Sequence, residues 1–61
     1  MTRQQIENAI DLCKGEPVTK IMQLFSMGMW RSDAVKDMAE YFGCSPDRES
    51  VALNLSIGIK A

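Results

Sequence analysis

The sequence predicts a mostly α fold, with three short helices followed by a C-terminal β-strand that pairs between subunits. Two observations predict it. Apolar residues recur at helical spacing in three stretches separated by glycines and prolines, whereas the last stretch alternates apolar and polar residues. A chain of 61 residues is long enough for one domain at most, so we expect residues 1–61 to form a single small helical domain.

The first predicted helix covers about residues 2–14. Thr2 and Gln5 have the spacing of a capping box, which satisfies backbone N–H groups at a helix start. Gly15 supplies a left-handed stop, and Pro17 cannot continue the same helix. The apolar residues of this stretch share one helical face: Ile6, Ala9, Ile10 and Cys13.

The second predicted helix covers about residues 17–27. Pro17 suits the first turn of a helix, where its missing N–H costs nothing, and Gly28 marks the end. The apolar spacing of the first helix returns here: Val18, Ile21, Met22 and Phe25.

The third predicted helix covers about residues 32–42. Ser32 is a good N-cap, Asp33 suits the positive end of the helix dipole, and Gly43 ends the helix. Its apolar stripe consists of Val35, Met38, Ala39 and Phe42.

Residues 51–59 are predicted to form the β-strand. No other segment alternates in the same way, so the strand needs a partner, and we expect an antiparallel pair with the same strand of a second copy in a homodimer. A helix is the alternative, because Val51, Ala52, Leu55 and Ile59 also share a helical face. The side chains of the predicted dimer strand are Val51, Leu53, Leu55, Ile57 and Ile59.

The residue types that catalysis and metal binding need are scarce. The chain has no histidine, and Cys13 and Cys44 are far apart without a close-spaced second ligand, so we expect no enzyme, no catalytic residue, no metal and no cofactor. We expect both cysteines to be reduced core thiols, with a disulfide between them as the alternative. The polar N-terminal residues and the lack of a long apolar run predict a cytoplasmic protein without a membrane segment.

Ala39, Gly43 and Ser45 have the spacing of a small residue at a close helix approach, a turn glycine and a helix cap. On these residues, the segment 35–45 resembles the first helix and turn of helix-turn-helix regulators. The resemblance implies a bihelical unit and binding to nucleic acid. Side chains of the recognition element would then be Ser45, Arg48 and Ser50.

The connection between the second and third helices contains the residue types that anchor protein interfaces. The candidate partner-binding residues are Met27, Met29, Trp30 and Arg31. Trp30 could instead fill the core, and both interpretations stay open.

Charge decides between the functions that remain. Residues 32–61 carry three basic and five acidic side chains, a net charge of −2 in the segment that would read DNA. The prediction is therefore a small non-enzymatic regulatory protein that inhibits or modulates a larger protein by binding it. The alternative is a helix-turn-helix DNA-binding transcriptional regulator, and the third candidate is an oligomerisation fragment of a longer protein.

Overall fold

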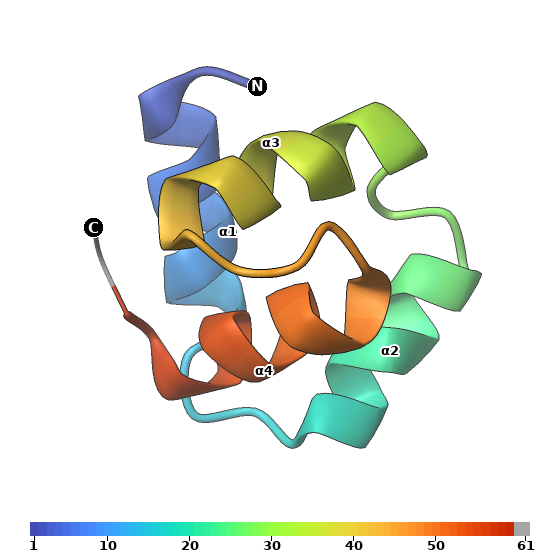
Figure 1. Ribbon diagram of the computed structural model, residues 1–61. Helices are drawn as coiled ribbons and strands as arrows, with labels where there is room; N and C mark the ends of the chain where they lie inside the picture. Colours follow the sequence, from blue (N-terminus) through green and yellow to red (C-terminus); the bar gives the residue numbers. More distant parts are fainter. Residues whose placement is uncertain (60–61) are drawn as a thin grey trace.

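Four helices form the fold in the computed structural model, which describes residues 1–59 (Figure 1). The helices are α1 (Arg3–Cys13), α2 (Val18–Ser26), α3 (Ser32–Phe42) and α4 (Arg48–Ile57). Within the described chain, every extensive contact between two helices involves α4, which packs against α1, α3 and, most closely, α2. The last helix in chain order is therefore the centre of the fold.

The prediction of a C-terminal strand is wrong, although the mostly helical character is confirmed. Residues 1–59 contain no strand, and α4 occupies most of the segment that was expected to alternate. Ala52 and Leu53 distinguish the two structures, because a strand would bury Leu53 and a helix buries Ala52. Ala52 is 0% exposed and Leu53 is 52% exposed. The predicted strand pairing between subunits falls with the strand, since Val51 and Leu55 are buried inside a single chain.

The ends of α4 explain why this segment is helical. The Asp47 carboxylate caps the first turn, accepting hydrogen bonds from the backbone N–H of Ser50 at 2.8 Å and from its hydroxyl at 3.0 Å. At the other end Gly58 has a φ of +76° and donates its N–H to the carbonyls of Asn54 and Leu55. A helix satisfies its backbone internally, whereas a strand without a neighbour would leave its N–H and C=O groups unpaired.

The first three helices form where their apolar spacing predicts them. Both hydrogen bonds of the predicted capping box are present: Gln5 N–H donates to Thr2 Oγ1 at 3.2 Å, and Thr2 N–H donates to Gln5 Oε1 at 2.8 Å. Gly15 has the left-handed φ of +82° that the sequence predicts for a helix stop.

The core lies where the apolar faces of the four helices meet around α4. Its largest fully buried side chains come from all four helices, and no polar or charged residue of the described chain is buried. These side chains are Phe25, Ile10, Ile21, Met38, Leu55, Val51 and Cys13.

The end of α4 is joined to the connection between α1 and α2. Gly15 N–H donates to the Ser56 carbonyl at 2.9 Å, and the Ser56 hydroxyl donates to the Glu16 carbonyl at 2.5 Å. These bonds span about forty residues of sequence and hold α4 against the connection between α1 and α2.

Candidate functional site

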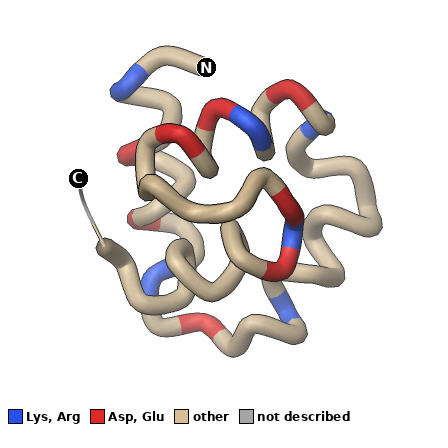
Figure 2. The backbone as a smooth tube through the Cα atoms, viewed as in Figure 1, with Lys and Arg blue, Asp and Glu red and all other residues tan. Residues whose placement is uncertain are grey.

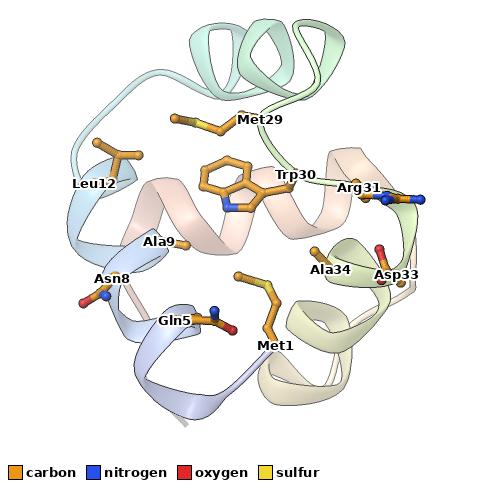
Figure 3. A pocket seen from close by; sticks show the side chains of 10 residues that line it. All are labelled: Met1, Gln5, Asn8, Ala9, Leu12, Met29, Trp30, Arg31, Asp33 and Ala34. Carbon is orange, nitrogen blue, oxygen red and sulfur yellow. The ribbon is translucent and has the colours of Figure 1, made fainter.

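An open surface pocket of about 550 Å³ lies between α1 and the segment that leads into α3 (Figure 3). α4 lies behind this pocket in the same view. The lining comes from two parts of the chain: Met1, Gln5, Asn8, Ala9 and Leu12 on one side, and Met29, Trp30, Arg31, Asp33 and Ala34 on the other.

Trp30 forms the middle of this pocket. Its side chain is half-buried and packs against the core, with the ring centroid 5.3 Å from that of Phe25 and a tilt of 57° between the two rings. Figure 3 shows the indole between the two walls, next to Met1 and Met29. The two interpretations of Trp30 are therefore compatible, since the residue completes the core and also lines a surface pocket.

The walls of this Trp30 pocket expose large apolar side chains beside the polar Gln5 and Asn8, and charged residues lie at its margin. Leu12 is 54% exposed and Met29 is 50% exposed. Arg31 and Asp33 lie at the margin, with the Arg31 side chain pointing away from the indole (Figure 3). An apolar centre with a polar rim is the usual anatomy of a protein-binding surface.

Three of the four predicted partner-binding residues meet in this pocket: Met29, Trp30 and Arg31. Met27 is not part of the lining and is 75% exposed at the end of α2. Leu12 completes the pocket and was not among the residues predicted from the sequence. A signal was present, because Leu12 is an apolar residue outside the buried stripe of its helix.

The helix pair that the helix-turn-helix resemblance implies is present as α3, a turn and α4. Ala39 is 2% exposed, and Gly43 ends α3 with a left-handed φ of +70°. The turn is longer than expected, because Asp47 rather than Ser45 caps α4, and Ser45 is exposed.

The candidate DNA-binding residues do not form a basic surface. Arg48 is exposed and lies between Asp47 and Glu49 in the sequence. The first turn of α4, where a backbone phosphate would bind, already holds the Asp47 carboxylate, and Ser50 donates two hydrogen bonds to it. Figure 2 shows that charged residues gather at the start of α4 and that the remainder of this helix carries none.

The two cysteines are free in the structure. Burial raises the pKa of the Cys13 thiol, Glu16 raises this pKa further, and Lys20 acts in the opposite direction. Residues 1–59 contain no group of three His, Cys, Asp or Glu side chains that could hold a metal ion. None of the described helices has the length and apolar character needed to cross a bilayer.

Comparison with known proteins gave no match of significance, whether to protein-family models, to curated proteins or to solved structures.

Proposed function

We propose that this protein is a small, non-enzymatic regulator that binds a segment of a larger protein in the Trp30 pocket. The observation that carries the proposal is the position of Trp30, a large aromatic side chain fixed against Phe25 and exposed toward an open pocket. A rigid aromatic ring anchors a partner at low entropic cost, because its packing already restricts it before binding.

The chemistry of the pocket indicates an amphipathic segment, such as one helical face, as the occupant. Leu12 and Met29 offer flexible apolar walls that adapt to an inserted aliphatic or aromatic side chain. Arg31 and Asp33 at the margin offer one charge of each sign to the polar flank of the same segment. Partner binding would bury apolar surface that the free protein exposes to water.

A matched pair of methionines tests this function. Met29 and Met27 are both exposed and lie two residues apart, but only Met29 lines the pocket. A photo-reactive amino acid at Asn8, on the pocket wall, would first identify partners by cross-linking in the source cell. Binding of the purified partner would then be measured by the change in Trp30 fluorescence. We expect Met29→Lys to weaken it at least about tenfold and Met27→Lys to leave it within about twofold.

Two results would contradict the proposal. Equal effects of Met29→Lys and Met27→Lys would place the binding surface elsewhere. Cross-linking from Asn8 that is no more specific than cross-linking from Gln23, an exposed position of α2 outside the pocket, would mean that no partner occupies the pocket.

A second candidate, DNA binding, is supported by the geometry of α3 and α4, specifically by buried Ala39 and left-handed Gly43. A mobility shift with genomic fragments at low salt tests it. A helix-turn-helix reader should retard DNA with a steep salt dependence, and Arg48→Ala should abolish the shift. The acidic start of α4 leads us to expect no retardation.

A further inference from the structure

The outward face of α4 is a second exposed apolar surface, separate from the Trp30 pocket. Leu53 is 52% exposed and Ile57 is 58% exposed. Because each helical residue advances by roughly 100°, these two side chains lie on the side opposite the buried Val51, Ala52 and Leu55. Leu53 and Ile57, with Glu49 one turn before them, form what we call the α4 ridge.

The two ends of the α4 ridge carry opposite charges. Glu49 lies in the first turn of α4. At the other end the Lys14 stem covers Gly58, so closely that a Cβ added to this glycine would lie 2.7 Å from Lys14 Cγ. Neither Lys14 nor Glu49 forms an ion pair with another described residue. The ridge thus runs from an acid, across apolar side chains, to a base, and neither charge is ion-paired within residues 1–59.

We infer that the α4 ridge binds the same ridge of a second copy of this chain, with the two α4 helices antiparallel about a twofold axis near Leu53. In this arrangement Leu53 contacts its own counterpart, and Ile57 lies opposite position 49 of the second copy. Lys14 beside Gly58 then approaches Glu49 of that copy, and the same contact occurs again at the other end.

The charge order favours this occupant over others. A twofold axis perpendicular to a helix places the start of that helix next to the end of its counterpart. A surface with opposite charges at its two ends is therefore complementary to itself. Parallel helices would instead bring Glu49 against Glu49. The antiparallel pairing also opposes the two helix dipoles favourably. Ser50, on the same outward side, is small enough to admit the Ile57 side chain.

This inference does not rest on the proposed function, because it uses a different surface. α4 lies behind the Trp30 pocket in Figure 3, so pairing through the outward side of α4 leaves the pocket uncovered. A dimer of this kind would present two Trp30 pockets, and a partner with two binding segments could engage both at once.

Sedimentation equilibrium over a range of protein concentrations tests the pairing. For the unmodified chain we expect an average mass that rises from 6.8 kDa toward twice that value as the concentration increases into the high micromolar range. Leu53→Lys should hold the mass at that of the monomer, with unchanged helical circular dichroism because the side chain is exposed. Leu12→Lys, a matched change in the Trp30 pocket, should leave self-association intact.

Exchange of the two end charges tests the orientation. Glu49→Lys and Lys14→Glu should each weaken the dimer about tenfold, and the double variant should restore the dissociation constant to within about threefold of the original. Thermal melts of each variant establish that the fold is intact.

Three outcomes would overturn the inference. If the chain remains monomeric at millimolar concentration, a second copy does not bind the ridge, and any partner of the ridge is a different protein. A Leu53→Lys dimer of unchanged affinity places self-association on another surface. A double charge variant that binds no better than the single variants excludes the antiparallel arrangement.

Discussion

α1 and α4 have similar lengths and similar ends, but they differ in how apolar residues are distributed around them. α1 has 11 residues and α4 has 10, and a side chain caps the start of each. The apolar residues of α1 lie on its buried face except for Leu12, whereas α4 has a buried face and an apolar outward face. A helix with one apolar face can be recognised from its sequence, whereas a helix with two apolar faces resembles a strand.

The largest expected effect separates the two faces of α4. Leu55→Ala should lower the free energy of unfolding by about 2–5 kcal/mol, because Leu55 is 0% exposed and its removal leaves a cavity at the centre of the fold. Leu53→Ala, the same chemical change on the exposed face, should change the stability of the monomer by less than about 0.5 kcal/mol. Urea unfolding at low protein concentration measures both.

A strand at this position would change the result for Leu53 and leave Leu55 buried. Residue 53 would then be inside and residue 52 outside, so Leu53→Ala would be costly and Ala52→Ser would be neutral. The helical structure predicts the opposite for Ala52→Ser, which would place a hydroxyl in a fully buried position.

The sequence predicted three of the four helices, and α4 shows why the prediction stopped there. Val51 and Leu55 fit both a period of two and a helical period, so they could not distinguish a strand from a helix. The decision depended on Ala52 and Leu53, and their burial is set by the other three helices. This effect could not be read from the sequence, because most of the contacts of α4 with other helices are made with α2 and α1, which lie far from it in the chain.

The glycines that follow α1 and α4 allow the C-terminal ends of the two helices to be compared. Gly58→Ala should cost about 1–2 kcal/mol for the left-handed conformation and should also displace the Lys14 stem. Gly15→Ala should lower the stability only by the cost of the left-handed conformation, because no atom lies within 4 Å of its added Cβ. Thermal denaturation of the two variants should therefore rank Gly58→Ala as the more destabilised, and equal melting temperatures would contradict the close approach of Lys14.

The caps of the same two helices should give a smaller effect. Asp47→Ala and Thr2→Ala should each cost about 1 kcal/mol, because each removes a side-chain acceptor from the first turn of a helix. We expect the larger loss for Asp47, which accepts from both the N–H and the hydroxyl of Ser50. Asp47→Asn, which keeps an acceptor, is the control and should retain most of the stability.

The smallest expected effect is a pH dependence that arises at the end of α1. Burial holds the pKa of the Cys13 thiol above its ordinary value of 9.0, so the folded chain keeps the proton that the unfolded chain releases. The free energy of unfolding should therefore fall as the pH rises through about 9. Cys13→Ala should be less stable at neutral pH but should show a weaker decline between pH 8 and 10, as measured by urea titrations.

Only the part of the candidate site that is continuous in sequence was predicted. Met29, Trp30 and Arg31 are adjacent, so their residue types alone led to the prediction of an interface. Leu12 comes from another helix, and only the fold brings it to the same pocket. Met27 has the right chemistry but lies outside the pocket, which residue type alone could not show.

The central position of α4 also affects how the chain acquires its structure during synthesis. Because the extensive helix contacts of the described chain all involve α4, a nascent chain that ends before Arg48 has three amphipathic segments but lacks the helix against which they pack most extensively. Folding must therefore wait until this segment has emerged from the ribosome, and it should then occur in one cooperative step. A premature stop anywhere before α4 would yield a polypeptide open to proteolysis instead of a smaller stable domain.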